Sequence, residues 1–437
     1  MRLQPFSHEV LRLAVPAFGA LVAPSLLLLT DAAFIGSLGT NQLAGYAGGA
    51  AVFGIASSLS YFLAYTSTSV VARRFGAAQA REAVADGIDY ITIGLVLGVG
   101  IALIMWWGAE SFAGAIGLSA AVVPEAVAWL HGVAFGAPAM MASMAAVGMF
   151  RGLQDTRITF LVTALQVAVN IALCATFLFV FHIGTFGAGL AVGVAETLGF
   201  VAYAVALLRY AHSIGAPARP SRMSSLGDAF VVGLPLLWRA LSLRVVFTGT
   251  TVVAARLGNG ELAAFQVSLS IWYVLSNLLD ALGIAAQAMV GKRLGASEGH
   301  LVHDVVQRLL RWSIGYGAIA GGITMLLAPV VPPLFSSDAH VQHLITLCLL
   351  VVGAHQPLAA IVFLLDGVLI GSGDRHYVAF VLTMAMTVFL PLAWAVLHWQ
   401  LGVLALWCAM IAFMATRGGL MWRRSRMDAW IIEGATR

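Results

Sequence analysis

Long apolar segments recur along this chain at short intervals, and they constrain its fold more than any other feature. A helix needs about 20 mostly apolar residues to cross a bilayer, and twelve segments of the chain are long enough to do so. They lie near residues 10–37, 43–72, 88–108, 126–148, 158–182, 185–208, 229–257, 262–291, 308–331, 343–367, 377–399 and 402–423. We therefore predict an all-α integral membrane protein with twelve transmembrane helices.

The composition agrees with a membrane protein, because 61% of the residues are hydrophobic and only 10% are charged. Soluble domains are about 25% charged. The first apolar segment is longer than the core of a removable signal peptide, so none is expected. Cys174, Cys348 and Cys408 lie far apart, which excludes a disulfide framework, and the histidines lack metal-ligand spacing. We expect no metal site, no cofactor and no nucleic-acid partner.

The distribution of Lys and Arg predicts how the chain is oriented. If the N-terminus is cytoplasmic, 20 of the 23 Lys and Arg residues lie in or beside cytoplasmic segments. The outer loops then hold only Arg256, while Arg239 and Arg244 lie inside the seventh span. The insertion machinery and anionic inner-leaflet lipid favour this bias. We predict a multi-pass protein of the cell's inner (plasma) membrane with both termini cytoplasmic.

The second half of the chain repeats the first at a constant offset in residue number, 219. Residues that coincide at this offset include Pro16 with Pro235, Pro138 with Pro357, Gly148 with Gly367, Asp155 with Asp374, and Arg73-Arg74 with Lys292-Arg293. Near the end we expect the offset to shorten to 215, where Gly187 meets Gly402. We predict six-helix lobes over residues 1–210 and 229–437, joined by a cytoplasmic linker over 211–228.

The number of spans in each half predicts how the halves are related. Six is even, so both halves enter the membrane from the same side and form parallel repeats. Parallel lobes that face one another enclose a central cavity, which suits alternating access.

Ionisable residues inside the spans are candidates for function, because each costs roughly 2.5–3.5 kcal/mol on insertion scales. The candidates we select are Asp31, Glu196, Asp280, Asp366, Arg239 and Arg244. A buried structural pair, such as Arg244 with Asp280, and a role in transport both remain open for the second-half group. For Glu196, a supporting hydrogen bond is favoured over direct coupling.

Asp31 differs from the others, since no Lys or Arg of its half lies deep within a span. Apolar surroundings without a cation favour the neutral form of a carboxyl group, so this acid could take up and release a proton. Pro16 lies 15 residues earlier in the same span and removes a backbone hydrogen bond, which predicts a bend there. An incidental proline and a satisfied acid remain the alternative.

Four runs of residues resemble the multidrug and toxic compound extrusion (MATE) family across essentially the whole chain. They are TDAAFIGSLG at 30–39, FRGLQDTR at 150–157, LDALGIAAQAMVG at 279–291 and LDGVLIGSGD at 365–374. Arg239, Arg244 and the sequence AAQ at 285–287 are most similar to the DinF-like branch. The resemblance implies a secondary antiporter that exports organic, often cationic or amphipathic compounds in exchange for protons or sodium. Small-molecule substrates and membrane lipid are the partners it implies, and the monomer is the expected state.

The resemblance also implies roles for single residues. The family's acid in the first span corresponds to Asp31, its bending proline to Pro16 and its asparagine in the fifth span to Asn170. The acid that another branch uses for cation binding corresponds to Asp366. Where some relatives have a second acid, this chain has Cys174, and it has Ile158-Thr159 where Thr-Pro is usual. A lone desolvated carboxylate favours protons, because sodium prefers several converging oxygens.

Our site prediction combines these roles with the intramembrane charges. The cation-coupling residues are Asp31, Asn170, Asp366 and Asp280; the hinge is Pro16; the substrate cavity includes Arg239, Arg244 and Glu196.

Other classes of membrane protein fit less well. A flippase for lipid-linked saccharides is the alternative within transport, and it should have extra spans or several cations, whereas only Arg239 and Arg244 are available. A prenyltransferase needs Asp-rich motifs, and an acyltransferase needs an exposed His or Ser dyad. A channel needs a filter-like loop. We find none of these three features in the sequence. We predict a transporter and not an enzyme.

Overall fold

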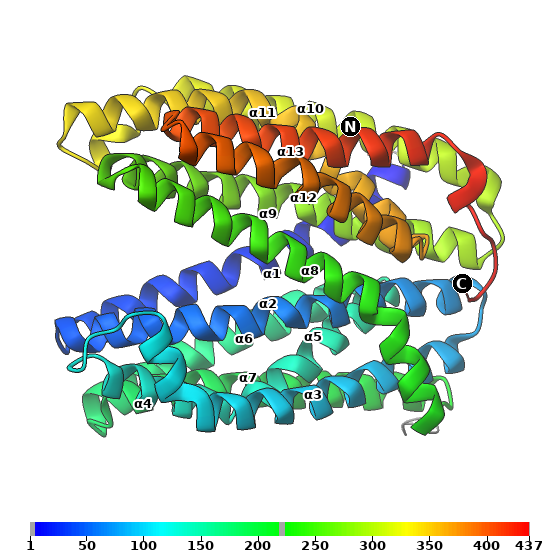
Figure 1. Cartoon of the computed structure of the whole chain (residues 1–437). Coiled ribbons are helices and arrows are strands. Elements are labelled where there is room, and N and C mark those ends of the chain that lie inside the picture. The colour runs from blue at the N-terminus through cyan, green and yellow to red at the C-terminus, as the bar shows by residue number, and fades with distance from the viewer. Residues whose placement is uncertain (1–4, 218–222, 437) are drawn as a thin grey trace. The chain divides into compact units, whose positions relative to one another are not determined.

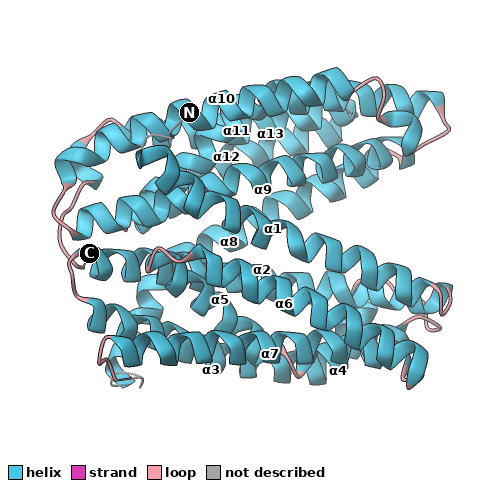
Figure 2. Ribbon diagram, turned by 180° about the vertical axis from the view of Figure 1, so that it is seen from behind, coloured by secondary structure: helices cyan, strands magenta, loops and turns pink. Residues whose placement is uncertain are grey.

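The computed structural model describes residues 5–217 and 223–436, and none of these residues lies in a β-strand (Figures 1 and 2). The helices of the first half are α1 (Pro5–Gly36), α2 (Thr40–Gly76), α3 (Ala80–Ala115), α4 (Val123–Ala134), α5 (Ala137–Gly152), α6 (Thr156–Ala175), the π-helix η1 (Thr176–Val180) and α7 (Gly184–Ser213). Those of the second half are α8 (Met223–Leu257), α9 (Asn259–Gly295), α10 (Gly299–Leu327), α11 (Ala339–Gly371), α12 (Arg375–His398) and α13 (Gly402–Ser425), with short 3₁₀ turns η2 (Pro332–Leu334) and η3 (Asp428–Trp430). Each predicted span coincides with one helix or with two successive helices.

The predicted span over residues 126–148 is broken into two helices. α4 and α5 are bent by 53° at a short break. Gly136 and Pro138 lie at this break, and proline cannot donate the backbone hydrogen bond that would continue α4. The proline at this bend also belongs to the sequence repeat, but its counterpart Pro357 lies inside the unbroken helix α11.

By length and apolar composition, the described residues contain ten helices that could each cross a membrane, and the bent α4–α5 pair is an eleventh candidate. The remaining predicted span is α10, whose first half carries Asp304, Arg308 and Arg311. These charges reduce its apolar length. The all-helical membrane fold is confirmed, and twelve spans in two sets of six are consistent with it.

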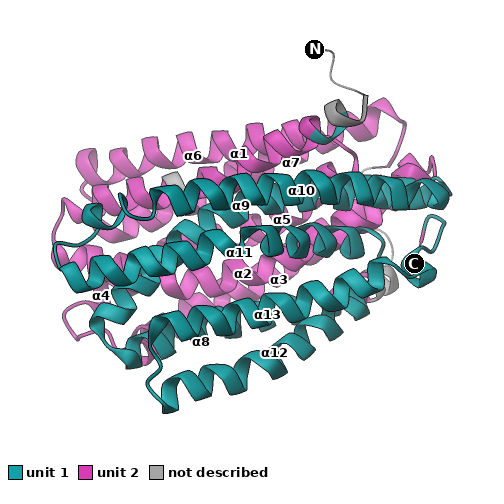
Figure 3. Cartoon of the chain, turned by 90° about the horizontal axis from the view of Figure 1, so that it is seen from above, with its two compact units in different colours: residues 1–10, 235–435, 437 teal, residues 11–234, 436 magenta. Residues whose placement is uncertain are grey.

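The chain divides into two compact units, coloured separately in Figure 3. The first unit, labelled unit 2 in Figure 3, contains Leu11–Leu234 and Thr436. The second unit, labelled unit 1 there, contains Pro235–Ala435 together with residues 5–10. Of the predicted linker, residues 218–222 lie outside the described residues. α8 begins at Met223, so its first turns occupy positions that we had assigned to the linker.

The same close helix contact occurs within each unit, at positions that the repeat relates to one another. A Cβ atom added at Gly148 of α5 would collide with the carbonyl of Ala64 in α2. One added at Gly367 of α11 would collide with the carbonyl of Gly283 in α9. Small residues allow helix backbones to approach closely in membrane proteins. Both partners of the contact shift by the offset of the repeat, so the sequence repeat is also a repeat of packing.

The structure corrects our assignment of the repeat near its end. We matched Gly187 to Gly402, but α13 begins at Gly402 with φ of 83°, and α7 begins at Gly184 with φ of 66°. The offset there is 218, not 215. The π-helix η1 accounts for the change, because a π turn holds one residue more than an α turn. The first half therefore carries a one-residue insertion directly after α6.

Candidate functional site

Asp31 of α1 and Asn170 of α6 meet inside the first unit. Both side chains are 1% exposed, and Asn170 Nδ2 donates to Asp31 Oδ1 over 2.9 Å. The thiol of the buried Cys174 also hydrogen bonds to Asp31. Asn170 and Cys174 are four residues apart and thus lie on one face of α6. The structure therefore brings together two residues that we predicted for the site and one, Cys174, that we had not assigned to it.

The surroundings of Asp31 are apolar. Ile35, one turn later on α1, is fully buried in a cluster with Tyr46, Trp129 and Leu178. The ring of Tyr46 packs edge-on against Trp129 with centroids 5.5 Å apart. None of the ion pairs in the described part of the chain involves Asp31. This acid is held by an amide and a thiol instead of a cation.

Pro16 lies inside α1, which continues through it as one helix. Because proline has no N–H group, the carbonyl of Arg12 loses its partner in the helix. Thr156, the first residue of α6, donates its hydroxyl to that carbonyl over 3.2 Å. α6 therefore contacts α1 at two levels, near the proline and at Asp31. A second proline, Pro24, lies between them and was missed by our sequence analysis.

Glu196 of α7 lies against another side chain of α6. Gln166 Nε2 donates to Glu196 Oε2 over 2.9 Å. Gly199 makes room for this contact, since a Cβ atom there would overlap the Gln166 side chain. A supporting hydrogen bond is what we favoured for Glu196; its place in a substrate cavity stays a prediction.

In the second unit, Asp366 of α11 accepts hydrogen bonds from two arginines. Arg239 of α8 approaches it through Nε at 3.0 Å and through Nη2. Arg417 of α13 approaches through Nη2 at 3.3 Å. All three side chains are buried. Two buried guanidinium groups therefore share one carboxylate.

The pair that we considered for Arg244 and Asp280 does not form between these two described residues. Arg244 is half-buried and interacts electrostatically with Tyr273 of α9, whereas Asp280 is half-buried further along α9. Arg239 is the arginine of α8 that pairs with Asp366. The rotation of α8 about its axis decides which of its arginines meets an acid. The positions of charges along a span do not determine this rotation.

Sequence reasoning missed Arg417 and Gln166. Arg417 lies within the span predicted over residues 402–423, but we counted it with the basic residues near the cytoplasmic end. Arg417 lies six residues before the end of that span, and this distance could have identified it as an intramembrane charge. Gln166 lies four residues before Asn170, and this spacing places both amides on one helix face.

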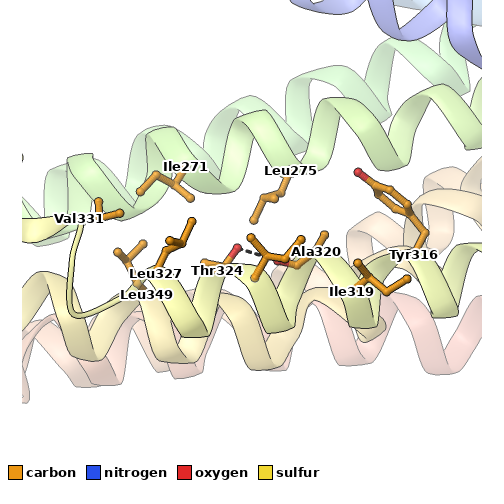
Figure 4. A pocket seen from close by; sticks show the side chains of 10 residues that line it. Ile271, Leu275, Tyr316, Ile319, Ala320, Thr324, Leu327, Val331 and Leu349 are labelled. Atoms are coloured by element: carbon orange, nitrogen blue, oxygen red, sulfur yellow. Dashed lines mark hydrogen bonds between the residues drawn. The ribbon is translucent and has the colours of Figure 1, made fainter.

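An apolar pocket of about 380 Å³ lies in the second unit between α9, α10 and α11 (Figure 4). Its lining includes Ile271, Leu275, Tyr316, Thr324 and Leu349. Thr324 donates its hydroxyl to the carbonyl of Ala320 on its own helix, as Figure 4 shows. None of the predicted site residues lines this pocket, so it does not contribute to the candidate coupling site.

The fold and the buried acids define a class of protein: a polytopic helical transporter built from two homologous halves. The family model described as MatE matches residues 16–176 and again residues 235–395, with both ends shifted by 219. The chain therefore belongs to the MatE family, and it is an efflux transporter and not an enzyme, as predicted.

Relatives and solved structures agree with this membership. The chain is 27% identical to "DNA damage-inducible protein F" of Escherichia coli over 96% of its length and 92% of the relative's. It is 27% identical to "Protein DETOXIFICATION 43" of Arabidopsis thaliana over 94% of its length and 88% of the relative's. The fold matches a Vibrio cholerae MATE transporter, VcmN in the bent form, with a TM-score of 0.87 and 19% identity over 96% of each chain.

Proposed function

We propose that this protein is a secondary active antiporter that exports organic, often cationic or amphipathic compounds in exchange for protons. The observation that carries the proposal is Asp31, an acid buried within a span and hydrogen bonded by Asn170, with no cationic partner among the described residues. Such an acid can exist in charged and neutral forms. A change between the two forms is what coupling to a cation requires.

The groups around Asp31 favour a proton over sodium. The amide N–H of Asn170 and the thiol of Cys174 are directed at the carboxylate. Hard cations are held by several oxygen ligands, whereas the two groups that contact the carboxylate here are hydrogen-bond donors. Sodium would have to displace them, whereas a proton needs only one carboxylate oxygen.

Protonation of Asp31 would act through its contact with α6. A hydrogen bond to a charged acceptor is roughly twice as strong as one to a neutral acceptor, so protonation weakens the hold of Asn170 on α1. α1 is suited to a change of shape, because it contains Pro16 and Pro24 and only 19% of its most apolar window is buried. One proton moving down 100 mV supplies about 2.3 kcal/mol. That energy corresponds to roughly a 50-fold substrate gradient.

Transport in proteoliposomes tests this proposal. Purified protein is reconstituted, and ethidium movement is followed with a pH gradient or a sodium gradient imposed separately. We expect a pH gradient alone to drive ethidium against its own gradient. Ethidium transport that follows the sodium gradient, or neither gradient, would contradict proton antiport.

The proposal also includes an orientation: both termini cytoplasmic, in the cell's inner membrane. It follows from the Lys and Arg distribution, and it places Ala78 inside and Ser337 outside. Single cysteines at these positions, in a chain whose exposed Cys408 is replaced by serine, would be labelled with a membrane-impermeant maleimide in whole cells. We expect labelling at position 337 only; equal labelling at both positions would refute the twelve-span orientation.

Small-molecule substrates and membrane lipid are the partners of this proposal, with the monomer as the transporting unit. The saccharide flippase is not favoured by the structure. Arg417 adds a third intramembrane cation, but it pairs with Asp366.

A further inference from the structure

One face of α6 carries a continuous row of polar side chains. The row has five members at spacings of three or four residues, so they share one face of the helix. They are Thr159, Thr163, Gln166, Asn170 and Cys174. Each contacts a polar group of another helix. Tyr203 of α7 donates its hydroxyl to the carbonyl of Thr159 over 3.4 Å and also hydrogen bonds to Thr163. Gln166 binds Glu196, and Asn170 and Cys174 bind Asp31.

Glu196 of α7 is hydrogen bonded to Gln166 of this row. The coupling step proposed at Asp31 does not use this acid. It lies within a span, where an acid costs several kcal/mol, and no ion pair within residues 5–217 involves it. Its hydrogen bond from Gln166 repeats the arrangement of Asp31 with Asn170. The two amides are four residues apart, or about 6 Å along the helix axis.

Glu196 and Asp31 contact the row at different depths in the membrane. Asp31 lies five residues before the end of α1 at Gly36, whereas Gln166 lies ten residues after the start of α6 at Thr156. This start is about 15 Å from Gln166 and belongs to the side that we assign to the cytoplasm. Glu196 is thus deeper in the membrane than Asp31 and nearer the inner end of the row.

We propose that Glu196 is a second proton-carrying residue, which receives the proton from Asp31 and passes it toward the Thr159 end of α6. The inference rests on proton coupling at Asp31 as proposed above. In each step one O–H bond breaks and one forms: the Asp31 carboxyl becomes a carboxylate, and the Glu196 carboxylate becomes a carboxyl. The proton then leaves to water at the inner end, and Glu196 is charged again.

The titratable groups near this route come from several helices. On α7 itself Tyr203 interacts with Glu196, and Arg151 of α5 interacts with Tyr203. Tyr46 of α2 and Cys174 of α6 interact with Asp31. Glu125 of α4 accepts from Thr185 over 2.6 Å at the opposite end of α7 from Tyr203. Arg151 lies in the last turn of α5, on the side of the membrane toward which the proton would leave.

The test compares two rates for the full-length protein in proteoliposomes. One is ethidium transport driven by a pH gradient, and the other is ethidium–ethidium exchange at equal pH. In Glu196→Gln we expect the ratio of driven to exchange rate to fall about tenfold, which is about 1.4 kcal/mol. In Glu196→Asp, which keeps an acid, most of the ratio should return. Glu110→Gln, at an exposed acid near the end of α3, is the matched control and should change neither rate.

The outcomes separate this inference from the proposed function. If the wild-type protein shows no transport driven by the pH gradient, proton antiport itself is wrong. If the wild type is driven and Glu196→Gln keeps its ratio, Glu196 carries no proton, because a purely structural or substrate-contact role lowers both rates together. Should Glu196→Gln fail to fold, Gln166→Met provides the second variant: the same ratio should fall, and an unchanged ratio would overturn the inference.

Discussion

The two halves of this protein share one scaffold but surround their intramembrane acids differently. Asp31 in the first half is held by the neutral amide of Asn170, whereas Asp366 in the second half lies between the guanidinium groups of Arg239 and Arg417. The difference shows that the repeat has preserved helix packing and not chemistry. One acid is hydrogen bonded by a neutral amide, and the other lies between two cations.

The equivalent positions support this interpretation. At the offset of the repeat, Asp31 corresponds to Thr250 and Asn170 to Phe389, while Asp366 corresponds to Val147. Each half therefore has its acid at a position where the other half has none. The acids are not duplicated copies of one site.

The first helix of each half differs as well. Pro16 corresponds to Pro235, but Pro24 corresponds to Leu243, so only α1 has a second proline. The most apolar window of α1 is 19% buried, compared with 33% for α8. Fewer packing contacts and a second interruption of the backbone hydrogen bonds make α1 the easier of the two to bend.

The largest expected effect of a single substitution on stability is in the second half. Asp366→Asn would leave two buried guanidinium groups without their carboxylate, and loss of one partner from a buried ion pair costs about 3–5 kcal/mol. Asp31→Asn should cost much less, because an amide at that position can still accept from Asn170. Thermal unfolding in detergent measures both variants. Equal losses would contradict the contrast between the two acids.

A smaller loss is expected for Asn170→Ala. The substitution removes the amide donor of Asp31 and leaves a buried acceptor atom unsatisfied, at a cost of about 1–3 kcal/mol. In the Asp31→Asn background the same substitution should cost less, because a neutral side chain then loses the partner. A double-mutant cycle on unfolding free energies measures this coupling. Additive losses would show that Asn170 and Asp31 do not interact as described.

The smallest expected effect concerns the hydrogen bond that Thr156 donates near Pro16. Thr156→Val removes the hydroxyl that donates to the Arg12 carbonyl, and one such bond contributes about 0.5–1.5 kcal/mol. In a Pro16→Ala background the loss should shrink, since alanine at position 16 restores the backbone N–H for that carbonyl. Unfolding free energies of the two single variants and the double variant provide the comparison. An undiminished loss in the double variant would mean that Thr156 does not replace the missing bond.

Much of the fold could be predicted, because membrane spans are set by local apolar length. The twelve segments follow from residues that are close in sequence, and the repeat follows from comparing the two halves, whereas the break near Pro138 was not predicted. Asp31 and Asn170 were identified through a family motif, and the structure places them in contact. One part of the repeat was wrong: the one-residue insertion at Thr176–Val180 changed the offset, and gapless alignment of similar apolar residues does not register it.

The partners of the second-half charges could not be predicted from the sequence. Arg239 and Arg244 are five residues apart on α8, and both have apolar neighbours in the sequence. The rotation of α8 and the positions of α11 and α13 decide which of the two arginines meets an acid. Hydropathy gives no information about either. Arg417 was missed for the same reason, as a charge near a span end is usually assigned to the loop.

The central claim is that coupling takes place in the first half, at Asp31. The most direct test measures ethidium export driven by a pH gradient for wild type, Asp31→Asn and Asp366→Asn, each reconstituted in equal amounts of folded protein. We predict that Asp31→Asn abolishes driven export, while folded Asp366→Asn retains a clear fraction of it. Export by Asp31→Asn against a gradient at the wild-type rate would contradict the account.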